Sequence, residues 1–342
     1  MASYEHRLSQ AYTRAQVLMK IVITGGCGYI GSHIARALKQ HDEDNRVYII
    51  DRVRRDHTLK DVDGYLHEDY ASKSSLLWIS ELEPDVIVHC AGSSLVGESM
   101  VNPAEYYENN IAKTIALLSH IKDLRKKPLI LFSSSASVYG NPATVPVYES
   151  DPKLPISPYG VSKHVTERLL SDYHAAYGIP SVCFRYFNAA GAEPFTHDLG
   201  QAPGASHIVA RILEAKLAGR SFTLNGADYN TPDRTCIRDY IHVWDLADAH
   251  IRAIEWMNNE NEKHAAVMNL GTEHGISNQE IIDYVTVNYG GIDVIVGPRR
   301  PGDPDRLVAS YNVAHTLLKW KPVYSTINQI VDSAYKWYTR EL

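Results

Sequence analysis

Short apolar runs alternate with longer helical patterns through the first half of the chain. Such apolar runs, most of them rich in Val, Ile and Leu, occupy residues 20–24, 47–50, 85–89, 129–132 and 181–184. Helical patterns lie between several of them, for example over 112–124 and 158–177. Buried strands that alternate with helices predict a parallel sheet covered on both faces. We therefore expect an α/β fold built on a Rossmann-type, doubly wound sheet.

The second half has a different pattern. Pro, Gly and Asp cluster at 225–233 and 297–305, between shorter elements. We expect a Rossmann domain over 19–188 with a later return near 236–268. A smaller α/β substrate-binding domain would cover most of 189–342. Residues 1–18 are polar without periodicity, so we expect a disordered N-terminal extension.

Composition and charge exclude several classes of protein. The 342 residues are 44% hydrophobic and 22% charged, with a net charge of -6, which argues against a nucleic-acid partner. No apolar run reaches the roughly 18 residues of a membrane span, and residues 1–18 lack a signal-peptide core. The four cysteines are far apart, a usage that fits a reducing cytoplasm and shows no metal-site pattern.

A glycine-rich segment points to a dinucleotide. Gly25-Gly-Cys-Gly-Tyr-Ile-Gly31 follows the first strand, and a helix is expected to open near Ser32. Glycines allow a tight turn and close approach of the backbone to a pyrophosphate, which the helix N-terminus attracts. Asp51 ends the second strand 20 residues after Gly31, where a carboxylate would hold a ribose 2′-OH. This favours NAD over NADP, although the adjacent Arg52 could accept a 2′-phosphate.

Tyr159 and Lys163 form the candidate catalytic pair. Their spacing of four residues places both side chains on one face of a helix. A nearby ammonium favours the phenolate, whose unperturbed pKa is about 10. The chain has 22 tyrosines, so such a pair is expected roughly once by accident. Its meaning depends on the rest of the sequence.

The glycine spacing together with Tyr159-x-x-x-Lys163 resembles the extended short-chain dehydrogenase/reductase family. The resemblance implies that the tyrosine is the acid–base catalyst. It implies that the lysine holds the nicotinamide ribose and lowers the tyrosine pKa. Ser135, in the run 132–140, takes the place of the family's catalytic serine.

Further motifs resemble one branch of that family, the UDP-glucose 4-epimerases. These motifs lie at 25–33, 91–92, 96–99, 185–188, 238–243, 269–272 and 299–303. Related dehydratases and decarboxylases place an acid just after the catalytic serine or threonine, whereas Ala136 and Ser137 stand here. The implied activity is therefore NAD-dependent interconversion of UDP-glucose and UDP-galactose through a 4-keto intermediate.

The resemblance also implies two sets of binding residues. The cofactor set is Gly25, Gly28, Tyr29, Ile30, Gly31, Asp51, Asp69, Tyr70, Ala91, Gly92, Asn110, Ser133, Tyr159, Lys163 and Tyr186. The substrate set is Ser135, Tyr159, Asn188, His207, Arg238, Arg300 and Asp303. Within it, Arg238 and Arg300 would grip the diphosphate and Asp303 a ribose hydroxyl. No metal ligand is expected.

Three departures from the usual epimerase motifs leave other nucleotide-sugar substrates open. Ser93-Ser94 stand where many epimerases have a lysine, Asn225 where some have an aromatic residue, and Leu307 where some have a tyrosine. The smaller Leu307 predicts room for an N-acetyl group. A 4-epimerase of UDP-N-acetylglucosamine, UDP-glucuronate or a UDP-pentose therefore remains open. A non-catalytic NAD-sensing protein should have lost Tyr159 or Lys163, and both are present.

The helices expected over 102–124 and 158–177 carry apolar residues on more than one face. Packing on the sheet explains part of this pattern. Relatives pair these two helices across a two-fold axis into a four-helix bundle. The resemblance therefore implies a homodimer.

Overall fold

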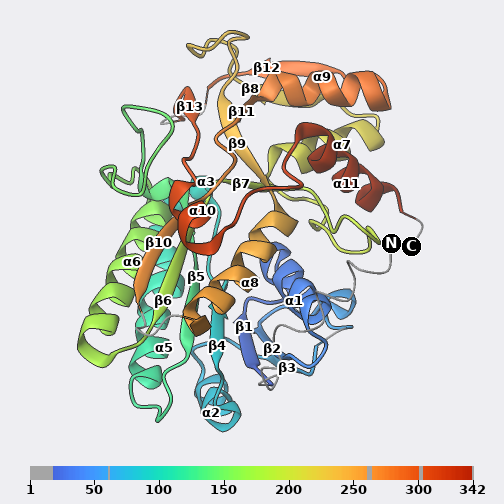
Figure 1. Ribbon diagram of the computed structural model, residues 1–342. Coiled ribbons are helices and arrows are strands. Elements are labelled where there is room, and N and C mark those ends of the chain that lie inside the picture. Colours follow the sequence, from blue (N-terminus) through green and yellow to red (C-terminus); the bar gives the residue numbers. More distant parts are fainter. Residues whose placement is uncertain (1–17, 61, 260–263, 300–302, 341–342) are drawn as a thin grey trace, which may run out of the picture.

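The computed structural model describes residues 18–60, 62–259, 264–299 and 303–340 (Figure 1). The extension expected over 1–18 lies outside the described residues except for Leu18. Arg300 also lies outside them.

A seven-stranded parallel sheet forms the centre of the first part and confirms the predicted fold class. Its strand order is β10-β6-β5-β4-β1-β2-β3. The strands are β1 (Lys20–Thr24), β2 (Arg46–Asp51), β3 (Gly64–His67), β4 (Val86–His89), β5 (Leu129–Ser135), β6 (Ser181–Tyr186) and β10 (Ala265–Leu270). Every apolar run predicted as a strand is one. The order reverses between β1 and β4, and in open α/β sheets ligands bind at such a crossover.

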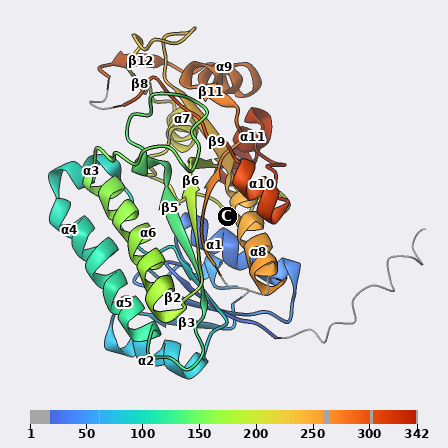
Figure 2. The same cartoon turned by 60° about the vertical axis from the view of Figure 1, so that its left-hand side comes forward.

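The two faces of the sheet bury alternate residues of each strand. Ile21 and Ile23 pack on one face, among α1 (Tyr29–His41) and α8 (Val243–Asn259). Val22 faces the opposite side, among α2 (Lys73–Leu82), α5 (Lys113–Ile121) and α6 (Pro158–Tyr177). Figures 1 and 2 show these helices as layers on either side of the strands. This double covering explains why the strands read as continuous apolar runs.

The helix that carries the catalytic pair has clear start and stop signals. The Ser157 side chain caps α6 by accepting from the Gly160 N–H, and Pro158 occupies the first turn. Gly178 ends the helix in the left-handed conformation, with φ of 69°. These bounds match the prediction of 158–177.

The helix expected over 102–124 is interrupted. It consists of α4 (Pro103–Tyr107), a π-helical turn η3 (Glu108–Ala112) and α5. A short helix α3 (Val96–Val101) precedes it. The π turn brings Asn109 and Asn110 into the buried side of the helix.

The second part is built from shorter elements. β7 (Asn188–Ala190), β9 (Ile237–His242), β11 (Gly275–Ser277) and β13 (Arg306–Leu307) form one sheet, and β8 (Phe222–Asn225) pairs with β12 (Val294–Gly297). The helices are α7 (Ile208–Leu217), α9 (Asn278–Tyr289), α10 (Asn312–Leu318) and α11 (Ile327–Thr339). Between β9 and β11 the chain returns to the large sheet as α8 and β10. Two short 3₁₀ turns, η2 (Asp56–Thr58) and η4 (Ala136–Val138), complete the description.

The first helix is tied to the second part by long-range hydrogen bonds. The Tyr29 hydroxyl donates to the Gly191 carbonyl at 2.6 Å. Arg36 pairs with Asp198 at 3.0 Å. These bonds fix the glycine loop against the segment that leads into α7. Among the described helices, none is both long enough and apolar enough to cross a membrane.

Candidate active site

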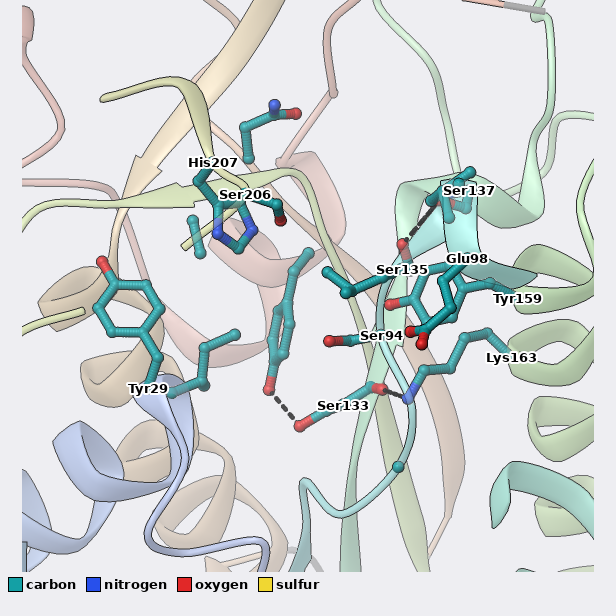
Figure 3. Close-up of a pocket in the computed structure, with 18 of the residues that line it drawn as sticks. Tyr29, Ser94, Glu98, Ser133, Ser135, Ser137, Tyr159, Lys163, Ser206 and His207 are labelled. Carbon is teal, nitrogen blue, oxygen red and sulfur yellow. Dashed lines mark hydrogen bonds between the residues drawn. The ribbon is translucent and has the colours of Figure 1, made fainter. Parts of the chain in front are cut away.

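A cavity of about 1520 Å³ opens at the carboxyl ends of the parallel strands. Its walls come from both parts of the chain: the glycine loop and β5 on one side, β8, β9 and α7 on the other. A space of this size is larger than the usual range for a single small-molecule ligand. Figure 3 shows the side chains that gather around it.

The glycine loop closes one end of the cavity. α1 begins at Tyr29, three residues earlier than the predicted Ser32, because the chain enters the helix directly from Gly28. Gly25 has a φ of +72°, and a Cβ on it would lie 2.7 Å from the Ala91 nitrogen. A Cβ on Gly31 would lie 2.4 Å from the Gly25 carbonyl oxygen. No side chain fits between these backbones, so the loop keeps the N-terminus of α1 open to an anion.

Asp51 is held where the sequence placed it. Its carboxylate accepts from the Cys27 N–H at 2.9 Å and from the Val53 N–H at 2.8 Å. Asp69 lines the cavity on the same side as Asp51. Its carboxylate pairs with the Lys113 ammonium at 2.7 Å, and the Arg52 Nε lies 3.9 Å from the same carboxylate. The Lys113 partner helps to hold the pKa of Asp69 below its usual range although burial opposes this.

Lys163 is the best-fixed member of the catalytic group. Its Nζ donates to the Ser133 carbonyl at 2.8 Å and lies 4.8 Å from the centre of the Phe132 ring. The side chain is 5% exposed. Burial lowers the pKa of Lys163 to about 8, although the Cys90 thiol and the Glu167 carboxylate oppose the shift. The ammonium is therefore charged at neutral pH, although its pKa lies only about one unit above that pH.

Tyr159 lies one turn before Lys163 and lines the same cavity. The lysine Nζ is 5.7 Å from the centre of the Tyr159 ring. Burial raises the pKa of Tyr159, and the Ser135 hydroxyl beside it lowers it. Desolvation of the phenol is the larger of these two effects, so the pKa of Tyr159 stands above its ordinary value.

Ser135 ends β5 and faces the tyrosine. Its hydroxyl lies 3.2 Å from that of Ser137 and accepts from the Ser137 N–H at 3.1 Å. The 3₁₀ turn that follows contains Ala136 and Ser137 and no carboxylate. The three residues predicted as catalytic are thus brought together at one point of the cavity.

Most of the other predicted cofactor residues line the cavity. They include Gly28, Tyr29, Ile30, Tyr70, Ala91, Gly92, Ser133 and Tyr186. Asn110 is the exception, because it lies behind the wall. It accepts from the Ser93 N–H at 2.8 Å and donates to the Ser162 hydroxyl at 2.9 Å, so it holds the loop after β4 instead of facing the cavity.

The predicted substrate residues line the opposite wall. Asn188, His207, Arg238 and Asp303 all face the cavity. Arg238 forms an ion pair with Asp303 and donates to its neighbouring Ile237 carbonyl at 2.8 Å. The two residues predicted to hold different parts of a ligand therefore hold each other in this structure. Ser94, Asn225 and Leu307, the three departures from the usual pattern, also line the cavity.

Two residues at the site were missed from the sequence. Arg211 on α7 lines the cavity, and its guanidinium lies 5.6 Å from the centre of the Phe222 ring. Glu98 on α3 also lines it and accepts from the Tyr106 hydroxyl at 2.9 Å. Arg211 follows His207 by four residues, and this helical spacing was the signal that could have found it. Glu98 lies inside the motif at 96–99, but the motif alone does not predict a role for its carboxylate.

The side chains that usually bind metals do not gather into a site in the described part of the chain. Among the described residues, no group of three His, Cys, Asp or Glu side chains could hold a metal ion. The glycine loop, the open end of α1 and the Asp51 carboxylate instead have the form of a dinucleotide cradle. The residues present therefore fit an NAD-type cofactor.

Comparison with known proteins defines the class. The chain belongs to the NAD dependent epimerase/dehydratase family, whose model matches residues 21–271.

Within that family, the chain is similar over nearly its whole length to UDP-glucose 4-epimerases. It is 40% identical to the UDP-glucose 4-epimerase of Halalkalibacterium halodurans over 94% of this chain and 96% of that protein. The structure resembles that of the Brucella ovis UDP-glucose 4-epimerase in complex with NAD, with a TM-score of 0.87, 35% identity, and 93% and 97% of the two chains covered. It also resembles the structure of the Bifidobacterium longum UDP-glucose 4-epimerase in complex with NAD⁺ and UDP, with a TM-score of 0.85 and 32% identity. That match covers 94% of this chain and 98% of the other.

Proposed function

We propose that this chain interconverts UDP-glucose and UDP-galactose by epimerisation at C4, with NAD as its cofactor. One observation carries the proposal. The catalytic group of Ser135, Tyr159 and Lys163 lies between a dinucleotide cradle and a polar wall. The 3₁₀ turn directly after Ser135 contains no carboxylate. An enzyme that eliminates water needs an acid at that place, whereas reversible oxidation at one carbon does not. The UDP-glucose 4-epimerases to which the chain is similar, at 32–40% identity, favour UDP-glucose over other nucleotide sugars.

The chain's own groups account for cofactor binding. The glycine loop and the N-terminus of α1 would hold the pyrophosphate, and Asp51 a ribose hydroxyl. Lys163 would contact the second ribose. Held by these residues, NAD would supply the acceptor and later the donor of the hydride at C4 of the sugar.

Tyr159 and Ser135 manage the proton. The Tyr159 phenolate takes the proton of the sugar 4-OH, and the Ser135 hydroxyl stabilises the oxygen during the transfer. Because burial raises the pKa of Tyr159, the phenolate depends on positive charge nearby, and Lys163 supplies it. The same proton returns to the sugar after the flat ketone has turned over.

Binding energy is placed on the nucleotide half of the substrate. Arg211 and Arg238 give the second wall its positive charge and would contact the diphosphate. Asn188 and His207 extend this wall, and Arg300 belongs to the same proposal although it lies outside the described residues. A sugar held through its nucleotide keeps the freedom to present either face to the catalytic group.

The assay compares three substrates. The purified protein is incubated in parallel with UDP-galactose, UDP-N-acetylgalactosamine and UDP-glucuronate without added NAD⁺, and the products are resolved. Formation of UDP-glucose from UDP-galactose, at the highest kcat/KM of the three, supports the proposal. Preferential conversion of either other sugar would overturn the substrate assignment.

We further propose that the protein is a cytoplasmic homodimer. Its four cysteines are all free, as expected in a reducing compartment. The helices α4, α5 and α6 lie on the outside of the sheet (Figure 2). They leave Tyr107 and Ile115 exposed at 40% and 39%, which supports an interface at this face.

A further inference from the structure

A buried ion pair lies directly behind the catalytic group. Arg185 on β6 donates twice to the Glu167 carboxylate on α6, from Nε at 2.9 Å and from Nη2 at 2.7 Å. The Ser134 hydroxyl donates to the same carboxylate at 2.5 Å. Ser134 belongs to the lining of the cavity, whereas Glu167 and Arg185 lie behind it, and the proposed chemistry uses the side chain of none of the three.

The position of this cluster in the fold is specific. Ser134 and Arg185 are register partners on β5 and β6. Glu167 lies four residues after Lys163, on the same face of α6. Its carboxylate therefore bridges the catalytic helix and the ends of two strands at a single point.

Burial makes the bridge rigid. Ser134, Glu167 and Arg185 are 2%, 6% and 3% exposed. Arg185 is also held from behind, since its Nη1 donates to the Tyr139 hydroxyl at 2.7 Å, and that hydroxyl donates to Asn269 at 2.7 Å. A bidentate, fully buried pair of this kind fixes geometry more than it adds stability.

Ser134 lies between two groups of the active site. The preceding carbonyl, of Ser133, accepts from the Lys163 ammonium, and the next hydroxyl is that of Ser135. A shift of Ser134 would move both. The same carboxylate also places a negative charge one helical turn from the lysine.

We propose that Glu167, clamped by Arg185, is a positioning residue that aligns Ser133 and Ser135 through Ser134 and favours the charged form of Lys163. The inference rests on the proposed function for its kinetic consequence, because Lys163 and Ser135 act in that reaction. Its electrostatic consequence is independent of any substrate.

The charge on Lys163 depends on several titratable neighbours. Those facing Lys163 are Cys90 and His89 from the end of β4, and Tyr159 and Glu167 from α6. Tyr186 on β6 in turn interacts with Cys90 and Tyr159. Those facing Glu167 are Arg185, His164, Cys183 and Lys153. Among the carboxylates of the described residues, Glu167 is the one that raises the pKa of Lys163.

Three variants separate the two effects. Glu167→Gln keeps the side-chain shape but removes the charge, so kcat should fall about ten- to a hundredfold with little change in KM. The alkaline limb of its kcat profile should move to lower pH. Ser134→Ala keeps the ion pair but breaks the link to β5, so kcat should fall without movement of the limb. Glu193 is another buried carboxylate and does not line the cavity, so Glu193→Gln should alter stability alone.

Lys163 can also be titrated directly. NMR of ¹³Cε-lysine, with the Lys163 signal assigned by its loss in Lys163→Met, reports its ionisation without turnover. A midpoint at lower pH in Glu167→Gln than in the unaltered protein and in Glu193→Gln is the expected result. An unchanged midpoint would overturn the proposal that Glu167 favours the charged form of Lys163. An unchanged kcat in folded Ser134→Ala would overturn the proposal that Glu167 aligns Ser133 and Ser135. Lack of any epimerisation by the unaltered enzyme would count against the proposed function, while the titration would still decide this inference.

Discussion

At the scale of the residue, Lys163 shows a conflict between stability and function. Burial holds its pKa near 8, well below its ordinary value of 10.5, so the folded protein disfavours the charge that catalysis uses. The free-energy cost of burying the charged ammonium is full below pH 8, where both the folded and unfolded chains carry the proton. It is relieved as pH rises towards 10.5, where the unfolded chain also loses it.

This conflict gives a prediction for Lys163→Met, which removes the titration. The free energy of unfolding of the variant minus that of the unaltered protein should be larger, that is more stabilising, at pH 7 than near pH 10.5, by about 3 kcal/mol. Urea unfolding at the two pH values measures it. A difference that is the same at both would show that the lysine is not desolvated.

The catalytic residues could be predicted from the sequence because their signals are local. Tyr159 and Lys163 are four residues apart, and Ser135 ends an apolar strand. The role of Glu167 could not be predicted, because its importance comes from neighbours distant in the chain. Glu167 meets Arg185, whose place beside Ser134 is set by a strand register that no local pattern encodes.

At the scale of the element, the glycine loop is the part of the site least tolerant of change. Gly31→Ala would place a methyl group 2.4 Å from the Gly25 carbonyl, a contact that only movement of the backbone can relieve. NAD binding should weaken by about tenfold or more, a loss of about 1.4 kcal/mol or more. Titration of cofactor-free protein with NAD⁺ measures the change.

The matched control is Gly291→Ala, where a Cβ would meet open space. It should bind NAD⁺ as the unaltered protein does. Equal affinity in Gly31→Ala and Gly291→Ala would contradict the role given to the loop.

Element prediction succeeded where one pattern determined the outcome. The buried strands and α6 were predicted because apolar runs and capping residues mark them. The interruption of the helix expected over 102–124 was not, because the π turn at Glu108–Ala112 has no such mark. Its reason is tertiary: it brings Asn110 into contact with Ser93 and Ser162.

At the scale of the whole molecule, the proposed dimer face can be tested by charge. Ile115 is 39% exposed on α5, so Ile115→Asp should leave the monomer folded but introduce repulsion and desolvation at a two-fold interface. Light scattering should show the mass of a dimer for the unaltered protein at micromolar concentration and a shift toward monomer for the variant.

A comparable change elsewhere on the surface serves as the control. Val287 is 81% exposed on α9, and Val287→Asp should leave the mass unchanged. Monomeric mass for the unaltered protein would refute the homodimer.

The whole molecule joins a dinucleotide cradle to a polar wall around one tyrosine, and the central claim is that hydrogen at C4 leaves and returns within this cavity. The direct test uses UDP-galactose deuterated at C4, with Tyr159→Phe as the inactive control. The account predicts UDP-glucose that retains deuterium at C4, formed without added NAD⁺, and a rate lower by about 10²–10⁴-fold in the control. Loss of the deuterium to solvent would contradict it.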